Sequence, residues 1–319
     1  MNARALNKEE AMNIQSILVA TDLSAQEDIA VQRAMRLAKT HRATVTLMYL
    51  PSAGQEVQGT AGARLAKAAR QLEERLELRV RTVPIQAHKV EDLVTRAKGM
   101  DLVVLPHRRK LSTAAFFRGQ PVLRLLRCSS CPVLVTRQIR GDDYRRILVS
   151  IDFSAESEAL VKLASELDSR ATLEIFHAIS PLGEARLRSA EATEQAVRAY
   201  RGRCLRQAQE RMGALMNSLD AGTGRLLTVI GRGDPGRQTV VQQQASGADL
   251  VVLGKRRTSA WEDFFCGSVA HQVLSWGSSD VLVVPHAHLQ ETARLAVRRM
   301  KRGLPEAALE IRPAGRRAS

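Results

Sequence analysis

The sequence has little of what defines a disulfide-rich, membrane-spanning or base-stacking protein. Its 319 residues include four cysteines, too few and too unevenly placed for a disulfide framework. Aromatic residues make up 3%, so platforms on which nucleic-acid bases could stack are scarce. No apolar run approaches the roughly 20 residues of a membrane-spanning helix, and residues 1–15 lack an apolar core of signal-peptide length. We therefore expect a cytoplasmic globular protein with no transmembrane segment.

The net charge is positive, +15 at pH 7, and it is unevenly distributed. The excess of Lys and Arg over Asp and Glu falls on residues 1–140 and 286–319, whereas residues 141–285 are nearly balanced. A basic surface attracts RNA, DNA or an anionic membrane face through long-range electrostatics. Association with nucleic acid through the first half and the tail is therefore one hypothesis, without sequence-specific recognition.

The chain contains one pattern twice. Residues 16–22 read SILVATD and residues 146–152 read RILVSID; each is an apolar run that ends in an Asp, and a Ser follows two residues later. The later matching segments are MDLVVLPHRR (100–109) with ADLVVLGKRR (248–257), and SSCPVLVT (129–136) with SSDVLVVP (278–285). A duplicated unit of this length predicts two similar domains.

Each half alternates short runs rich in Val, Ile and Leu with stretches of helical period. The runs are continuously apolar, which indicates parallel strands that are covered on both faces. The expected strands are 16–20, 43–50, 80–86, 101–105 and 132–136 in the first half, and 146–151, 171–177, 225–230, 249–253 and 280–284 in the second. The alternation predicts an α/β fold with two tandem Rossmann-like domains, each a five-stranded parallel sheet with helices on both faces.

Composition predicts where one domain ends and the next begins. The expected division is an N-terminal extension 1–15, a first domain 16–137, a linker 138–145, a second domain 146–285 and a basic C-terminal tail 286–319. The tail is expected to hold a helix at 289–302 and a disordered end. The second copy is longer than the first, and we assign the surplus to a long polar helix near 184–220.

Two of the cysteines, Cys128 and Cys131, have the spacing of a redox pair or of half a zinc site. Alternatively, Cys128 ends a helix and Cys131 opens a buried strand, where cysteine packs as a small apolar residue. The second half has Trp276 and Ser279 at the equivalent positions. Because the repeat does not keep the pair, we favour the packing role.

The loops after the first and fourth strands of each half are the candidate ligand site. In an open parallel sheet, ligands bind beyond the carboxyl ends of the strands where the winding reverses. Asp152 is placed to accept a hydrogen bond from a ribose hydroxyl; alternatively it is a turn or helix-capping residue, as Ser154 is. Gly254 allows close approach of a phosphate, and Gly267 with Ser268 opens a helix whose N–H groups favour an anion.

These motifs resemble tandem domains of the universal stress protein (UspA-like) family, from Ser16 to Pro285. The resemblance rests on ILVATDLS and ILVSIDFS, on ADLVVLGKRR, and on the Gly-Ser helix start followed by VLVVP. It implies the adenine nucleotide alpha hydrolase-like version of the Rossmann fold. It also implies pairing through the last strand, so that the two domains form an internal pseudo-dimer. A further homodimer and an unknown protein partner are left open.

The nucleotide-binding branch of that family carries Gly-x-x-Gly, nine residues, and then Gly-Ser or Gly-Thr. The second copy has Arg257 in place of the second Gly, and the first copy keeps only Gly119 of the motif, with Arg109 at the position of Arg257. The resemblance implies a site for ATP or another adenine nucleotide formed by Ser150, Ile151, Asp152, Ala178, Gly254, Gly267, Ser268 and Val269. Arg257 either fills the phosphate position or clamps phosphate oxygens.

No arrangement of catalytic residues repeats between the copies. The histidines share no ligand spacing, the pair His286 and His288 has no carboxylate near it in sequence, and no metal is expected. We therefore interpret the protein as non-catalytic: a regulatory or interaction module of the stress response with a degenerate nucleotide site in its second domain. The alternatives are an adenine-nucleotide switch acting through that domain and a basic nucleic-acid-associated protein.

Overall fold

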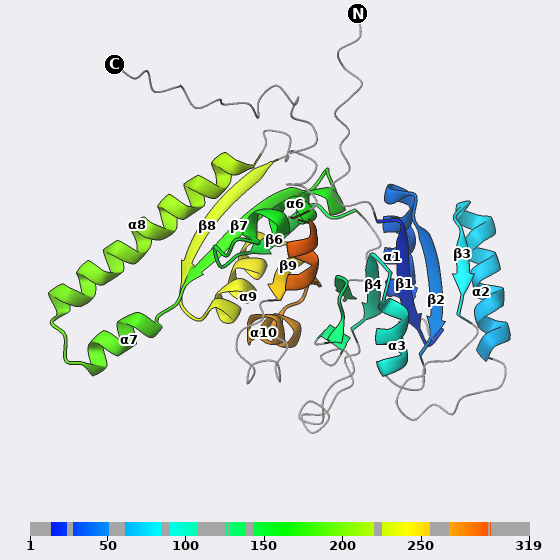
Figure 1. The fold of residues 1–319 in the computed structure, drawn as a ribbon, viewed down its shortest axis with the longest axis horizontal. Helices are drawn as coiled ribbons and strands as arrows, with labels where there is room; N and C mark the ends of the chain where they lie inside the picture. The colour runs from blue at the N-terminus through cyan, green and yellow to red at the C-terminus, as the bar shows by residue number, and fades with distance from the viewer. Residues whose placement is uncertain are drawn as a thin grey trace, which may run out of the picture.

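The fold is a single ten-stranded sheet covered by helices. The computed structural model describes residues 14–23, 28–50, 61–83, 90–107, 125–126, 128–137, 143–219, 225–255, 268–292 and 294. In these residues the strand order is β3-β2-β1-β4-β5-β10-β9-β6-β7-β8. Figure 1 shows the sheet crossing the molecule, with α2 at one end and the α7–α8 hairpin at the other.

The strands of each half follow the positions predicted from the sequence. They are β1 (Ser16–Thr21), β2 (Thr44–Tyr49), β3 (Val80–Thr82), β4 (Leu102–Pro106) and β5 (Val133–Thr136), then β6 (Arg146–Ser150), β7 (Thr172–Ile179), β8 (Leu226–Arg232), β9 (Leu250–Lys255) and β10 (Asp280–Pro285). The helices are α1 (Asp28–His41), α2 (Ala61–Leu76), α3 (Val90–Ala97), α6 (Ser157–Leu167), α7 (Leu182–Ser189), α8 (Glu194–Ser218), α9 (Pro235–Ser246) and α10 (Ser268–Trp276). Within each half all strand pairs are parallel.

The side chains of the sheet alternate between two apolar clusters, one on each face. In β1, Ile17 and Val19 belong to one cluster, and Leu18 and Ala20 belong to the other. Helices α1, α2, α6 and α8 contribute to the first cluster, and α3, α9 and α10 contribute to the second. Because both clusters contain residues of both halves, the core is continuous between them. The predicted α/β fold with helices on both faces is confirmed.

The two halves join through antiparallel pairing of β5 with β10. Val133 pairs with Val283, Leu134 with Leu282, and Val135 with Val281. The registers of β4–β5 and β9–β10 make Leu134 the equivalent of Leu282, so these equivalent residues pair with each other. A local pseudo-two-fold axis therefore relates β5 to β10. The pairing expected through the last strands is confirmed, and it turns two parallel half-sheets into one mixed sheet.

Between β7 and β8 the second half has a helical hairpin, where the described residues of the first half contain α2. The long polar helix predicted near 184–220 is present as α8, but it begins at Glu194, and the first part of the range forms the separate helix α7. Thr193 ends the break: its side chain accepts a hydrogen bond from the N–H of Ala196 and caps α8. Only three residues of α8 are buried, namely Val197, Ala208 and Met212, so the hairpin projects from the sheet (Figure 1).

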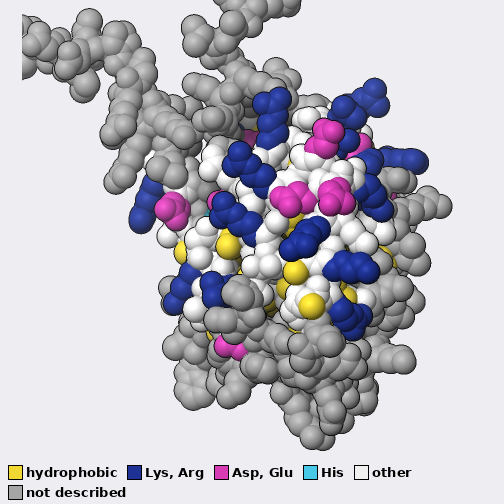
Figure 2. Space-filling view, turned by 90° about the vertical axis from the view of Figure 1, so that its right-hand side faces the viewer, with side chains coloured by type: hydrophobic (Ala, Val, Ile, Leu, Met, Phe, Trp, Pro, Cys, Tyr) yellow, Lys and Arg dark blue, Asp and Glu magenta, His cyan; other side chains and the backbone are white. Residues whose placement is uncertain are grey.

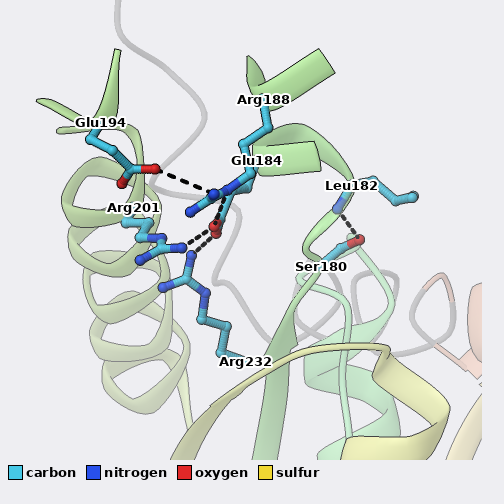
Figure 3. Close-up of polar contacts among 7 residues, drawn as sticks. All are labelled: Ser180, Leu182, Glu184, Arg188, Glu194, Arg201 and Arg232. Carbon is cyan, nitrogen blue, oxygen red and sulfur yellow. Dashed lines mark hydrogen bonds and ion pairs between the residues drawn. The ribbon is translucent and has the colours of Figure 1, made fainter. Parts of the chain in front are cut away.

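Glu184 of α7 holds this hairpin to the sheet. Its carboxylate accepts hydrogen bonds from Arg201 of α8 and Arg232 of β8, and from Arg188 at 3.3 Å (Figure 3). The bond from Arg201 is the main cause that lowers the pKa of Glu184 from 4.5 to about 2. Tyr200 lies so close to Gly183 that a Cβ there would overlap its hydroxyl. Arg188 also forms an ion pair with Glu194 of α8 at 3.3 Å, so ion pairs and one close packing contact hold the hairpin.

We expect the α7–α8 hairpin to lose stabilisation as the pH falls from 4.5 towards 2. The folded-state pKa of Glu184 lies below its unfolded value, so the ionised carboxylate favours the closed hairpin above that range. The contribution disappears as Glu184 becomes protonated. Hydrogen-exchange protection factors of α7 and α8 measure this effect. In Glu184→Gln the pH dependence should vanish, whereas Glu158→Gln in α6 should keep it; the reverse pattern would contradict the assignment.

Candidate functional site

The candidate site lies where the winding of the second half reverses. The order β10-β9-β6-β7-β8 places β6 beside β9, and Ser150 at the end of β6 pairs with Leu253 of β9. Ile151 and Asp152 follow β6 directly, and Gly254 is the next residue of β9. Residues about 100 positions apart in sequence therefore meet at one edge of the sheet, as ligand-binding loops do in open α/β sheets.

A turn holds the exposed carboxylate of Asp152. Its Oδ1 accepts a hydrogen bond from the N–H of Ser154 at 2.9 Å. Between them Phe153 adopts a left-handed conformation, with φ of 56°, and Leu23 does the same in the first half, with φ of 58°. Helix α6 has Glu156 as its N-cap residue, without a side-chain capping bond. Of the alternatives for Asp152, the structure therefore supports the turn rather than the helix cap.

His177 forms one wall of the site, a role that the sequence did not suggest. Its Nδ1 lies 3.0 Å from the carbonyl oxygen of Ile151, and its ring centroid lies 4.2 Å from that of Phe153. Burial lowers the pKa of His177 below 6.5. The ring is therefore neutral at pH 7, and its Nδ1–H donates to the carbonyl. His177 and the next residue, Ala178, lie near the end of β7. Ala178 is 7% exposed.

The hydroxyl of Ser150 is engaged within the protein. Thr239 of α9 donates its hydroxyl to the carbonyl oxygen of Pro235 at 2.7 Å, and the hydroxyls of Thr239 and Ser150 lie 3.0 Å apart. Since the proton of Thr239 is already donated, Ser150 is the donor between them. Its hydroxyl thus ties β6 to α9 as a donor, and its oxygen can only accept a hydrogen bond from a ligand.

Gly254 is a glycine that the fold itself does not require. Its φ is not in the left-handed region, and an added Cβ would meet only Leu160 at 3.6 Å and Leu289 at 3.7 Å, which are ordinary contact distances. Arg257 and Gly267 lie outside the described residues. Ser268 begins α10, and Val269 packs against the cluster on that face. The structure therefore places Ile151, Asp152, Ala178 and Gly254 at one edge of the sheet, at the ends of the neighbouring strands β7, β6 and β9.

A short C-terminal helix covers one side of this loop cluster. Residues 286–292 are helical, three residues earlier than the sequence predicted, and the end of the predicted range lies outside the described residues. Leu289 is 2% exposed and lies against Gly254. His286 and Gln290 contact Glu156 at 3.6 Å and 3.5 Å. The loop after β6 is therefore held by a segment that follows the last strand.

The first half lacks several features of this edge. Pro106 occupies the position of Gly254 and lies buried in β4, opposite Thr136 of β5. Asp22 is 7% exposed, whereas Asp152 is exposed. Arg109 and Gly119 lie outside the described residues. A proline has no N–H for a phosphate oxygen, so this edge is a poorer anion site than its counterpart.

Cys131 has the surroundings of a packing role, whereas Cys128 is exposed. Cys131 is 5% exposed, and its Sγ lies 3.4 Å from the hydroxyl of Ser129. Burial raises the pKa of Cys131, which disfavours the thiolate. Among the residues that the structure describes, no three His, Cys, Asp or Glu side chains are grouped as metal ligands would be. The same residues include no helix that is long and apolar enough to cross a membrane.

Basic side chains gather at the outer edge of the first half. Figure 2 shows this end of the molecule, where Lys and Arg surround a smaller group of acidic residues. The exposed basic residues of α2, β3 and α3, with their flanks, are Arg64, Lys67, Arg70, Arg75, Arg79, Arg81, Arg96 and Lys98. Such a surface attracts polyanions without reading their sequence. Association with nucleic acid stays a prediction.

The fold is a Rossmann-like α/β sheet whose strand order occurs twice in one chain. A model of the universal stress protein family matches residues 13–137 and 143–285. The chain therefore belongs to the universal stress protein family and contains two copies of its domain, as the resemblance of the motifs indicated. The two halves of the continuous sheet described above correspond to these two copies.

Comparison with individual proteins agrees with this assignment. The chain is 26% identical to a universal stress protein of Mycolicibacterium smegmatis, over 84% of this chain and 96% of that relative. Its fold is similar to that of a universal stress protein from Archaeoglobus fulgidus, with a TM-score of 0.63, 16% identity and coverage of 86% of this chain and 98% of the other. A functionally unknown protein from Pseudomonas aeruginosa PAO1 matches with a TM-score of 0.62, 21% identity and coverage of 90% and 99%.

We expect Leu289→Ala to lower the free energy of unfolding by about 2–5 kcal/mol, because it removes a fully buried leucine from a packed cluster. Leu205→Ala in α8 is the matched control: this leucine is 44% exposed, and the change should stay within about 0.5 kcal/mol. Urea unfolding followed by circular dichroism measures both. Equal losses in the two variants would show that the C-terminal helix does not cover the site.

Proposed function

We propose that the protein is a non-catalytic regulatory or interaction module of the stress response, whose second domain (146–285) retains a degenerate site for an adenine nucleotide. One observation carries this proposal. The exposed carboxylate of Asp152 stands beyond β6, beside the Gly254 end of β9, at the point where the winding reverses. A carboxylate at this place in the fold accepts hydrogen bonds from ribose hydroxyls, and a glycine at a strand end lets a phosphate approach the backbone closely.

The polar groups around this point support binding rather than hydrolysis. Hydrolysis of a phosphate ester or anhydride needs a base positioned to activate water. The hydroxyl of Ser150 donates to Thr239, and the Nδ1–H of His177 donates to Ile151, with the ring packed on Phe153. These contacts hold the side chains of Ser150 and His177 in place beside the loop that follows β6. The ligand class that fits is ATP or another adenine nucleotide, and the first domain serves mainly as structural partner.

We expect ATP and ADP to bind at one site per chain, and Asp152→Ala to raise the dissociation constant about tenfold or more, because a hydrogen bond to a charged group is lost. Asp22→Ala removes the equivalent carboxylate of the first half and should leave binding unchanged. Isothermal titration calorimetry on the full chain measures both. Absence of heat above dilution at millimolar nucleotide would sink the nucleotide part of the proposal.

Arg257→Gly distinguishes the two roles of that arginine in the same titration. If the side chain fills the phosphate position, the variant binds ATP more tightly than the native chain. If the guanidinium clamps phosphate oxygens, the variant binds ATP more weakly, while its affinity for adenosine stays the same. Phosphate release measured over hours in these samples should equal that of buffer; steady release would contradict a non-catalytic role.

A second candidate function is a nucleotide-dependent switch. The observation in its favour is the C-terminal helix, because Leu289 and His286 contact Gly254 and the β6–α6 loop, two parts of the proposed site. A ligand that moves Gly254 or the β6–α6 loop changes how the C-terminal helix packs against them. In this case ATP should alter hydrogen-exchange protection of residues 286–292 at least several-fold. Unchanged protection at saturating ATP would leave the simple binding module.

A further inference from the structure

A buried polar triad lies where the two halves meet. Arg33 of α1 is 3% exposed, and its Nε lies 3.2 Å from Oδ2 of Asp280, which is fully buried. Tyr144 donates its hydroxyl to the same oxygen at 2.9 Å, and the Arg33 guanidinium lies 4.1 Å from the centre of its ring. The N–H of Arg137 donates to Oδ1 of Asp280 at 2.7 Å. Both carboxylate oxygens are therefore satisfied without water.

Burial keeps the hydroxyl of Tyr144 protonated. Tyr144 is 2% exposed, and burial, followed by the nearby Asp280 charge, raises the pKa of Tyr144 well above its usual value. Its hydroxyl is thus a permanent donor. Arg33 comes from the first half, whereas Tyr144 and Asp280 belong to the segment that starts the second half and to its last strand. The triad therefore exists only where the two halves are paired.

The sheet registers define the counterpart of each residue in the other half. Ile17 and Ile147 are the first residues that pair with the fourth strand in their respective halves. Val133 and Val281 are likewise equivalent in the pairing of the fourth strand with the fifth. Counting from these positions, the counterparts are Leu163 for Arg33, Ile14 for Tyr144 and Pro132 for Asp280. All three counterparts are buried and apolar. The pseudo-two-fold axis thus relates a polar side of the interface to an apolar side.

This asymmetry distinguishes the pairings that the two edges could form. If the first half paired with a copy of itself, each Arg33 would face Ile14 and Pro132 and would be buried without an acid. If the second half paired with itself, each Asp280 would face Leu163 and would be buried without a base. A buried charge that loses its partner is strongly destabilising. Only the pairing of unlike halves satisfies every charge.

We propose that the Arg33–Tyr144–Asp280 triad selects the partner at the β5 and β10 edges: it admits the first half against the second and rejects either half against its own copy. The device is a charge that is penalised in the wrong pair rather than an attraction added to the right one. It keeps two similar edges within one chain from joining copies of the protein into open-ended assemblies. The partner that fits the β5 edge must offer a buried acid at the position of Asp280.

The test starts from the folded full chain. A protease site is inserted within 138–142, between the two segments matched by the family model, and the folded protein is cut there. Native mass spectrometry then separates like and unlike pairs, because the halves differ in mass. Mixing with isotope-labelled cut protein shows that partners exchange. The native sequence should give unlike pairs only, with exchange of label between them.

Arg33→Leu with Tyr144→Ile and Asp280→Val makes both sides of the interface apolar. This triple variant should give like and unlike pairs in the proportions of random assortment. Arg33→Leu alone gives an independent measurement if the triple variant does not fold. It should produce like pairs of the first half, and no like pairs of the second. Arg36→Leu is the control, because Arg36 forms an exposed ion pair with Asp143 across the same interface at 2.7 Å; it should give unlike pairs only.

Three results would overturn the proposal. The first is a native protein that forms like pairs as often as unlike ones. The second is a pair of variants, the triple change and Arg33→Leu, that both still form unlike pairs only. The third is separation of the cut native halves without re-pairing, because the selection then depends on the covalent link and not on the triad.

Discussion

Antiparallel pairing of β5 with β10 is the contact on which the rest of the structure depends. A five-stranded parallel sheet has an exposed strand at each edge, and an exposed edge presents unpaired N–H and C=O groups. In this chain the fifth strands of the two halves form hydrogen bonds with each other. One sheet and two apolar clusters therefore extend through both halves. Helices α1 and α6 pack against a core to which the opposite half also contributes. Ala34 of α1, for example, belongs to the same apolar cluster as Leu134 of β5 and Leu282 of β10.

Duplication gave two equivalent edges, and the two halves have diverged around them in different ways. At the carboxyl ends of the strands, the second half has Gly254 and an exposed Asp152, where the first half has a proline and a nearly buried Asp22. At the shared interface, the pseudo-two-fold axis relates the three polar residues of the triad to three apolar residues. The candidate ligand site thus belongs to one half, and the contact between halves has a direction. Both differences rest on a few side chains, because the strand framework is the same.

Much of the fold could be predicted because its cause is local. Continuous apolar runs such as ILV and VVL mark strands buried on both faces, and their repetition predicted two Rossmann-like halves. The family resemblance implied that these halves pair through their last strands. The long helix predicted near 184–220 begins later, at Glu194, because helical period does not show where Thr193 caps a new helix. The C-terminal helix begins at 286 because Leu289 finds a place against Gly254 and Leu160, a contact that no local pattern reveals.

The candidate site divides in the same way. The sequence by itself determined which residues follow the strand ends, namely Asp152 after the first strand and Gly254 in the fourth, because the pattern of strands and the repeat set their order. Only the tertiary structure decided that Ser150 donates to Thr239, that His177 is held by Ile151, and that Arg33 meets Asp280. Each of these contacts joins elements far apart in the chain. Hydrogen bonds and ion pairs depend on distances of a few ångströms, and packing of the whole sheet sets those distances.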